Sequence, residues 1–317
     1  MPRSTSTGVG ALQFANDWRE RAVRLTIETG KIADTMNTGT RASIADLRDS
    51  IRRLDRVVVA FSGGADSALV AWAANDVLGP ERALAVTAVS PSLPTSERDE
   101  CARLADEWGL RWVEVATDEM EQAAYSRNDG DRCYWCKEAL LRAIEPIAGP
   151  ESATVVLGVN VDDLGDHRPG QRAAAERGAV FPLVEAGFTK ADVRDWSQRL
   201  GLRTWDKPAA ACLASRLPYG TPVTLRRLAA VEQAEAGLRT LGFAELRVRH
   251  YGDLARIEVP TTQLAEAVAR ADDVVRMVQA AGYRYVTLDL EGLRSGNLNA
   301  ALGLTAGRPA SGSTSGS

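Results

Sequence analysis

The stretch SGGADS, residues 62–67, decides the fold of the larger part of the chain. It follows the apolar run VVVAF (57–61) and precedes the apolar segment ALVAW (68–72), an order that predicts a buried strand, a tight loop and a helix. Two adjacent glycines let the backbone approach an anion closely, and the unpaired N–H groups at the helix start point at that anion. The stretch therefore predicts a phosphate-binding loop.

This loop differs from the kinase-type phosphate loop. No Gly-Lys-Ser/Thr follows it, so no neighbouring lysine is ready for the terminal phosphates. It carries Asp66 and two hydroxyls instead, and a carboxylate beside a phosphate site suits a bridging magnesium ion. The pattern SGGxDS after a strand resembles the signature of the ATP-pyrophosphatase (PP-loop) superfamily. Its members cleave ATP between the α- and β-phosphates and adenylate a carboxylate or carbonyl oxygen.

The composition is that of an ordinary globular protein, with 317 residues, 45% of them apolar and 25% charged. A net charge of −4 exerts no general pull on nucleic acid. No apolar run approaches the length of a membrane span, and the N-terminus lacks the order of a signal peptide. We therefore expect a cytoplasmic protein with no membrane or nucleic-acid partner, in which the four cysteines serve metal binding or catalysis rather than disulfides.

The order of predicted elements indicates the fold class. Strands at 82–89, 112–115 and 154–157 alternate with helices at 97–109 and 136–147, which predicts an α/β fold with a doubly wound parallel sheet, PP-loop and HUP-like. From Thr221 the pattern changes to alternating strands and two helices, typical of a smaller α+β C-terminal domain. We predict a partly disordered N-terminal extension (1–42), the PP-loop domain (43–220), the C-terminal domain (221–305) and a disordered tail (306–317). Met36, before the first well-patterned helix, is a candidate translation start.

A polar, acidic segment, GVNVDDLGDHRPG (158–170), follows the strand at 154–157. Ligands of parallel sheets bind beyond the carboxyl ends of strands, so this segment and the phosphate loop are expected at one edge. Its acids would hold a second metal contact or a ligand's hydroxyls. Turn chemistry explains the same residues equally well, because Asp, Asn, Gly and Pro are turn formers.

The cysteines suggest a metal site. Cys133 and Cys136 form a CxxC pair, and Cys212 lies far downstream. Three thiolates lack the fourth ligand of a closed zinc site, for which His167 and His250 are the available imidazoles. A four-iron cluster on three cysteines would leave one iron open for sulfide or substrate. Packing of semi-buried thiols is the simpler alternative, and Cys101 falls on the apolar stripe of a helix and is predicted to be core.

With these residues described, the chain resembles the LarE family, the ATP-dependent sulfur transferases that help build the nickel-pincer nucleotide of lactate racemase. The resemblance runs from about residue 43 to 303. It includes, in order, DRCYWCK, GVNVDDLGDHRPG, ACLASRLPYG, LRVRHYGDLARIEV and YVTLDLEGLRSGNLN. Several independent motifs in the right order make it specific.

The resemblance implies the reaction and its cofactors. A carboxylate of pyridinium-3,5-biscarboxylic acid mononucleotide would be adenylated and converted to a thiocarboxylate, with Asp66 and Cys212 as the catalytic residues. In some members the cysteine matching Cys212 gives up its own sulfur and becomes dehydroalanine. Members that also carry the CxxC are thought to hold a four-iron cluster that supplies sulfide, and Cys133, Cys136 and Cys212 favour a [4Fe-4S] form here. ATP and Mg²⁺ would bind at Ser62, Gly63, Gly64, Asp66 and Ser67.

The resemblance also implies substrate contacts and partners. Arg247 and Arg249 match arginines that hold the substrate phosphate, and Glu232 or Glu235 falls near a family acid. The full set of predicted substrate residues is Arg216, Arg247, Arg249, Asp163, Asp166 and Arg168. The expected partner is a small mononucleotide, and the family suggests a homo-oligomer. The alternatives are a PP-loop tRNA thiolase, an ammonia-using amide synthetase, and a non-catalytic nucleotide-binding module with structural zinc.

Overall fold

The computed structural model describes residues 42–165, 169–208 and 211–294. The expected N-terminal extension up to residue 41, Met36, the tail 306–317 and the loop residues Asp166, His167 and Arg168 lie outside the described residues. The described chain forms two compact units. The first takes in the chain up to Val89, Thr95–Thr117 and Cys133–Ala210, and the second takes in Ser90–Pro94, Asp118–Arg132 and the chain from Ala211. The predicted domain boundaries stay a prediction.

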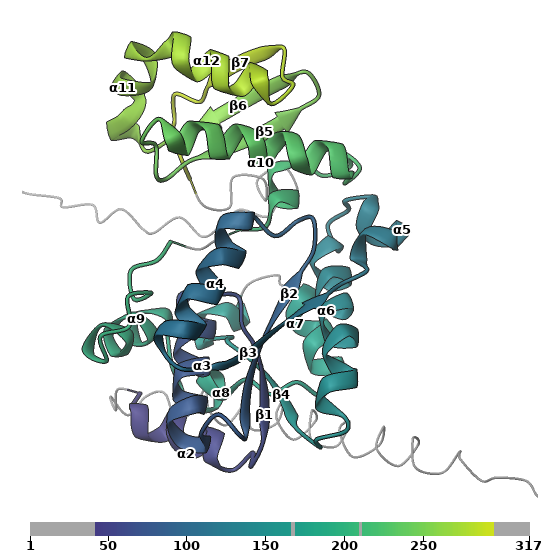
Figure 1. Cartoon of the computed structure of the whole chain (residues 1–317), viewed down its shortest axis with the longest axis vertical. Helices are drawn as coiled ribbons and strands as arrows, with labels where there is room; N and C mark the ends of the chain where they lie inside the picture. The colour runs from purple at the N-terminus through teal and green to yellow at the C-terminus, as the bar shows by residue number, and fades with distance from the viewer. Residues whose placement is uncertain (1–41, 166–168, 209–210, 295–317) are drawn as a thin grey trace, which may run out of the picture. The chain divides into compact units, whose positions relative to one another are not determined.

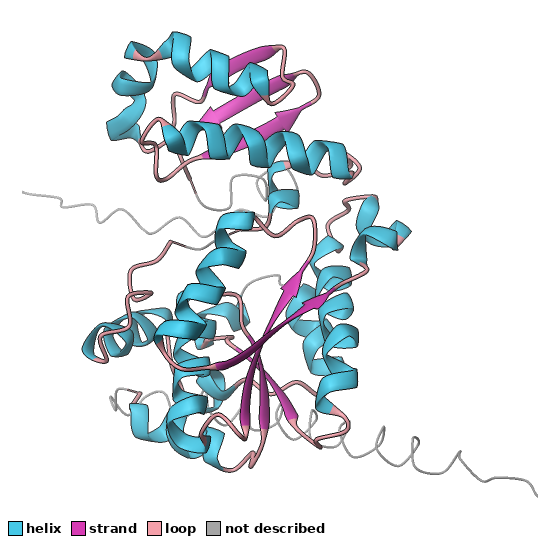
Figure 2. Cartoon of the chain, viewed as in Figure 1, coloured by secondary structure: helices cyan, strands magenta, loops and turns pink. Residues whose placement is uncertain are grey.

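The first unit is an α/β structure with a parallel sheet, which confirms the predicted fold class. Within the described residues its sheet has the order β3-β2-β1-β4, and all neighbouring strands are parallel (Figure 2). The strands are β1 (Val57–Ala60), β2 (Ala83–Val89), β3 (Arg111–Ala116) and β4 (Thr154–Leu157). The helices are α2 (Ile44–Arg52), α3 (Ala65–Leu78), α4 (Thr95–Glu107), α6 (Arg132–Ala148), η2 (Val161–Gly165), α7 (Pro169–Glu176), α8 (Pro182–Glu185) and α9 (Lys190–Arg199).

Burial on both faces explains why β1 is a continuous valine run rather than an alternating pattern. Val57 and Val59 join the core formed with α2 and α3, and Val58 joins a separate core with α6 on the opposite face. Each of these valines is 1% exposed. Figure 1 shows α3 and α4 on one side of the sheet and α6 on the other. The sheet is therefore covered on both faces, as the doubly wound fold requires.

The second unit contains the predicted smaller α+β structure. Its sheet has the order β5-β6-β7, antiparallel between β5 and β6 and parallel between β6 and β7. The strands are β5 (Arg247–Tyr251), β6 (Leu254–Glu258) and β7 (Tyr285–Leu288). The helices are η1 (Glu119–Glu121), α5 (Ala123–Ser126), η3 (Leu213–Arg216), α10 (Leu225–Thr240), η4 (Thr261–Gln263), α11 (Leu264–Ala269) and α12 (Ala271–Ala280). The apolar sides of α10 and α12 share one core with the sheet, in which Val248, Leu238 and Val278 are buried.

No helix in the described part of the chain is long and apolar enough to cross a membrane.

A glycine after β4 lets two backbone segments pass each other closely. A Cβ added at Gly158 would lie 2.5 Å from the backbone nitrogen of Ser67 and 2.7 Å from its Cα. Such contacts are shorter than real side chains make, and backbone atoms do not give way as a side-chain end does. The end of β4 therefore packs directly on the first turn of α3, which carries the phosphate loop.

We expect Gly158→Ala to lower the free energy of unfolding by about 1–3 kcal/mol, because the added methyl overpacks a backbone contact. Urea denaturation measures this change. Gly237→Ala is the matched control, since its Cβ would meet only the Met277 side chain, at 3.2 Å and beyond, and helix propensity favours alanine there. Equal stabilities of Gly158→Ala and the wild type would contradict the close approach.

Candidate functional site

The phosphate loop is held in shape by its own hydroxyls. The Ser62 amide donates to the Ser67 hydroxyl (3.2 Å), and that hydroxyl donates to the Gly64 carbonyl (3.1 Å). The two serine hydroxyls lie 3.1 Å apart. Gly63 has φ of +66°, a conformation that glycine adopts without strain. The loop between β1 and α3 is thus preformed.

The first turn of α3 is open to an anion. Its N-cap is Gly64, which has no side chain to cap the first amides. The N–H groups of a helix start have no partner within the helix and carry the positive end of the helix dipole. This geometry suits an anion, and the assignment of Ser62–Ser67 to phosphate binding stays a prediction.

Asp66 is oriented by a residue for which the sequence suggested no role. The Asn160 side-chain amide donates to Asp66 Oδ1 at 3.0 Å, and Asn160 is fully buried. Asp163 in turn fixes Asn160. Each backbone N–H of this pair donates to the other's side-chain oxygen, both at 3.2 Å. Because β4 pairs with β1, the segment after β4 reaches the loop after β1, and this placement makes Asn160 a positioning residue for Asp66.

Asp163, predicted to contact substrate or metal, is 6% exposed and takes part in this bracing. Of the three predicted substrate residues in the acidic segment, it is the one that the structure describes. Its contacts do not test substrate binding, which stays a prediction.

A lysine from a distant part of the chain reaches the phosphate loop. The Lys207 ammonium donates to the Gly63 carbonyl at 3.0 Å and to the Glu97 carboxylate at 2.8 Å. The sequence around the loop contains no lysine, and the fold supplies one 144 positions away. The sequence gives no indication of this contact, apart from the position of Lys207 just before the motif that contains Cys212.

Cys101 is a core residue, as predicted from its helical stripe. Its side chain is fully buried, and its sulfur lies 3.0 Å from where a Cβ of Gly63 would stand. Burial raises the pKa of the Cys101 thiol to about 11. This thiol therefore packs under the phosphate loop in its protonated form.

The three other cysteines lie in different units of the described chain. Cys133 is exposed and Cys136 half-buried in the first turn of α6, whereas Cys212 belongs to the second unit. Across the described ranges, no group of three or more His, Cys, Asp or Glu side chains is close enough to hold a metal ion. The structure therefore does not support the predicted iron–sulfur site, and it leaves His250 bound to the Tyr283 hydroxyl through Nδ1 at 3.1 Å.

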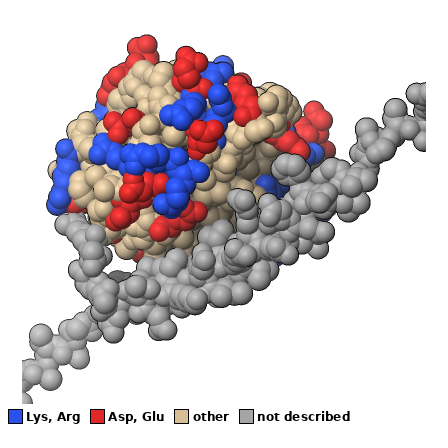
Figure 3. Space-filling model, turned by 90° about the horizontal axis from the view of Figure 1, so that it is seen from below, with Lys and Arg blue, Asp and Glu red and all other residues tan. Residues whose placement is uncertain are grey.

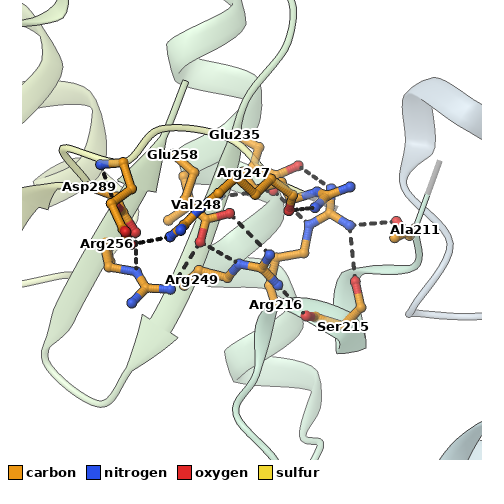
Figure 4. A network of polar contacts seen from close by, with 12 residues as sticks. Ala211, Ser215, Arg216, Glu235, Arg247, Val248, Arg249, Arg256, Glu258 and Asp289 are labelled. Carbon is orange, nitrogen blue, oxygen red and sulfur yellow. Dashed lines mark hydrogen bonds and ion pairs between the residues drawn. The ribbon is translucent and has the colours of Figure 1, made fainter. Parts of the chain in front are cut away.

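Two buried ion pairs organise the second unit (Figure 4). Arg216 donates to both carboxylate oxygens of Glu235, at 2.8 and 3.2 Å. Arg249 on β5 does the same to Glu258 on β6, at 3.0 Å for both bonds. Both glutamates are fully buried. Such two-pronged pairs fix the guanidinium planes, so these arginines are rigid.

Glu235 also receives further donors, among them the Val248 amide at 3.1 Å. The family resemblance left open which of Glu232 and Glu235 falls near the family acid, and one of the two lies beside the arginines. The structure places Glu235 there, because it is the buried residue on the inner side of α10.

The arginine network is attached to the segment that contains Cys212. Arg216 Nη1 donates to the Ala211 carbonyl at 2.6 Å and to the Cys212 carbonyl at 3.3 Å, while Arg249 donates to the Ser215 carbonyl at 2.8 Å. Cys212 is the N-cap residue of η3 and is half-buried. The backbone carbonyl of Cys212 is thereby hydrogen-bonded to a guanidinium that Glu235 holds in place.

Arg247 differs from the other two arginines in its partner. Among the described residues it donates to the Arg294 carbonyl, at 2.9 Å, and forms no ion pair with a carboxylate. Burial lowers the pKa of Arg247, and the positive charges of Arg249 and Arg216 lower it further. The guanidiniums of Arg216, Arg247 and Arg249 together favour a nearby anion. Arg247 is the position for it, because in the described residues the other two already have carboxylate partners.

We expect Arg249→Met to lower the free energy of unfolding by about 3 kcal/mol, because it removes the two-pronged partner of a fully buried carboxylate. Arg247→Met, on the same face of the same strand, is the matched control and should cost less than about 1 kcal/mol. Urea denaturation of both variants checks the difference. Similar losses in the two variants would contradict the division between a structural and a ligand-binding arginine.

Comparison with known proteins identifies a matching family and several relatives of this chain. The family described as NAD synthase matches residues 42–137, the part that contains the phosphate loop. An uncharacterised protein of Synechocystis, slr1717, is 46% identical over 82% of this chain and 98% of that protein. The uncharacterised protein MJ0830 of Methanocaldococcus jannaschii is 24% identical over 76% of this chain and 91% of that protein.

A relative with a named activity is the pyridinium-3,5-bisthiocarboxylic acid mononucleotide synthase of Lactiplantibacillus plantarum. It is 41% identical over 84% of this chain and 95% of that protein. The shared region takes in both units described above. The chain therefore belongs to the same family as this synthase, the LarE family of PP-loop enzymes.

Proposed function

We propose that the protein is an ATP-dependent sulfur transferase. It adenylates a carboxylate of pyridinium-3,5-biscarboxylic acid mononucleotide and converts it to a thiocarboxylate for nickel-pincer nucleotide synthesis. The relative from Lactiplantibacillus plantarum supports the product class. The structural observation that carries the proposal is the attachment of Cys212 to the arginine network through Arg216, which joins a sulfur nucleophile to an anion-binding group in one unit.

Activation is the task of the phosphate loop. A carboxylate is a poor electrophile, since its oxygen would have to leave as oxide. Its attack on the α-phosphorus forms an acyl adenylate and breaks the bond to the β-phosphate, which releases pyrophosphate. The amides at the start of α3 face the phosphates, and Asn160 holds the Asp66 carboxylate beside them. A carboxylate oxygen of this kind suits magnesium, which when bound there would offset phosphate charge.

Sulfur delivery is the task of the second unit. The sulfur nucleophile attacks the acyl carbon, and AMP leaves with the bonding electrons. If the sulfur is that of Cys212, the resulting thioester breaks at the Cβ–S bond after loss of the Cα proton. The products are then the thiocarboxylate and dehydroalanine at position 212. Arg216 holds the Cys212 carbonyl and so positions the residue for attack.

Substrate recognition falls to Arg247. In the described part of the chain its guanidinium forms no ion pair with a buried carboxylate, and a phosphate monoester can accept two parallel hydrogen bonds from such a group. Arg216 and Arg249, which buried carboxylates hold in place, would help to orient the phosphate through their positive charge. The proposal includes no nucleic-acid partner and no membrane, and a homo-oligomer is part of it on family grounds.

The face shown in Figure 3 suits this choice of a small substrate. Lys and Arg side chains lie among Asp and Glu side chains there rather than in one basic patch. A tRNA thiolase would need a continuous positive surface for the phosphate backbone. Retention of the protein on tRNA at moderate salt would favour that alternative over the mononucleotide.

We expect Asp66→Asn to abolish ATP-dependent pyrophosphate release while the fold survives, because the variant keeps the side-chain size and loses the magnesium-binding charge. Pyrophosphate release and circular dichroism measure the two properties. Asp76→Asn is a suitable control, since Asp76 pairs with Arg48 at the protein surface. Unchanged pyrophosphate release in Asp66→Asn would refute the role of Asp66.

We expect Cys212→Ala to retain pyrophosphate release and to lose thiocarboxylate formation, because activation precedes sulfur transfer. Mass spectrometry of the product checks the second step. An ammonia-using amide synthetase would instead keep full turnover in this variant, and that result would overturn the proposal.

The source of the sulfur is decided by one anaerobic experiment with the wild-type protein. Its iron and sulfide content is quantified, and its intact mass is measured before and after ATP and substrate. Loss of the mass of hydrogen sulfide at Cys212 identifies the protein's own cysteine as donor. Iron and sulfide that disappear in Cys136→Ser, with an unchanged mass, would instead establish the predicted cluster. Zinc without iron would favour the nucleotide-binding module.

A further inference from the structure

We propose that Lys207 binds the β- and γ-phosphates of ATP and stabilises pyrophosphate as it leaves. This inference rests on the proposed function and names a further residue for its first step. Lys207 lies far from the phosphate loop in the sequence, and the fold brings it to Gly63.

The position of the ammonium is set by two oxygens. Lys207 Nζ lies 3.0 Å from the Gly63 carbonyl and 2.8 Å from Glu97 Oε2. The two side chains are 17% and 21% exposed, so the pair is largely shielded and still reachable by a ligand. An ammonium has three N–H groups, and within the described residues these two contacts use two of them, so a phosphate oxygen can bind the third and then compete with Glu97.

The charge at the loop explains why a cation is needed there. An anion on the first amides of α3 would lie close to the Asp66 carboxylate of the same helical turn, whose negative charge opposes it. The Lys207 ammonium, held at the Gly63 carbonyl, places a positive charge beside the loop that can offset this repulsion once a phosphate replaces Glu97 as its partner. A kinase-type loop obtains the same charge from a lysine of its own sequence, which this loop lacks.

Glu97 acts as the partner of Lys207 when no phosphate is present. It lies in the first turn of α4, which packs next to the loop through Cys101 and Leu104. A pyrophosphate group carries more negative charge than one carboxylate, so it competes for the ammonium. As the bond between the α-phosphorus and the bridging oxygen breaks, that oxygen gains charge that the ammonium offsets, without any proton transfer from Lys207.

A purely structural role for Lys207 makes a different prediction. If the lysine only tied the loop to α4, its loss would distort the loop and weaken every nucleotide that binds there. If it binds the β- and γ-phosphates, its loss weakens ATP and pyrophosphate but not AMP, which lacks those groups. The ratio of ATP to AMP affinity therefore separates the two roles.

The experiment measures binding of ATP, AMP and inorganic pyrophosphate to the full chain by calorimetry with magnesium present. In Lys207→Met we expect ATP and pyrophosphate affinity to fall by about tenfold or more, the effect of losing a charged hydrogen bond, with AMP affinity unchanged. Lys190→Met is the matched control, since Lys190 begins α9 in the same unit. It should bind all three ligands as the wild type does. Equal losses for ATP and AMP in Lys207→Met, or no loss of either, would overturn the inference.

Two further variants keep the test decisive if Lys207→Met does not fold. Lys207→Arg retains the charge and should retain most of the ATP affinity. Glu97→Gln removes the competing carboxylate and should bind pyrophosphate several-fold more tightly, and unchanged or weaker binding there would contradict the exchange of partners. These affinities need no turnover. Absence of pyrophosphate release by the wild type with a carboxylate substrate would therefore count against the proposed function and not against Lys207.

Discussion

The burial of β1 between two other parallel strands is the constraint on which the first unit depends. β1 pairs with β2 on one side and β4 on the other, and its valines face two separate cores. Pairing on both sides fixes the position at which β1 ends. The backbone that follows it must turn at Gly63 and begin α3 at Ala65, so the anion-binding amides are held by the sheet and not by the loop alone.

The same sheet edge brings the other parts of the proposed nucleotide site to the loop. The segment after β4 crosses the first turn of α3 so closely that Gly158 has no room for a side chain, and two residues later Asn160 reaches Asp66. α4 supplies Glu97, and the segment after α9 supplies Lys207. Three chain segments thus place charge and hydrogen bonds around one helix start, which is the arrangement that phosphate chemistry requires.

The second unit solves a different problem, which is to keep several arginines close together. Positive charges repel, and burial costs each of them its hydration. Glu235 and Glu258, both fully buried, each hold one arginine by two hydrogen bonds. That compensation leaves Arg247 as the guanidinium whose contact is a carbonyl. Within the described residues, arginines of one network therefore differ in whether their partner is a buried carboxylate or a carbonyl.

Local patterns in the sequence by itself determined the α/β class, the phosphate loop and the core position of Cys101, since these follow from hydrophobic periodicity and from the steric freedom of glycine. The motifs also determined the family. The sequence could not show that Asn160 donates to Asp66 or that Lys207 binds the Gly63 carbonyl of the loop. It also could not show that Arg249 pairs with Glu258 while Arg247 does not. Each of those contacts joins residues from separate elements. It therefore depends on the order and register in which the strands pair, which local sequence patterns do not show. The predicted three-cysteine cluster depends on a contact of the same kind, because spacing pairs Cys133 with Cys136 and nothing local in the sequence brings Cys212 to them.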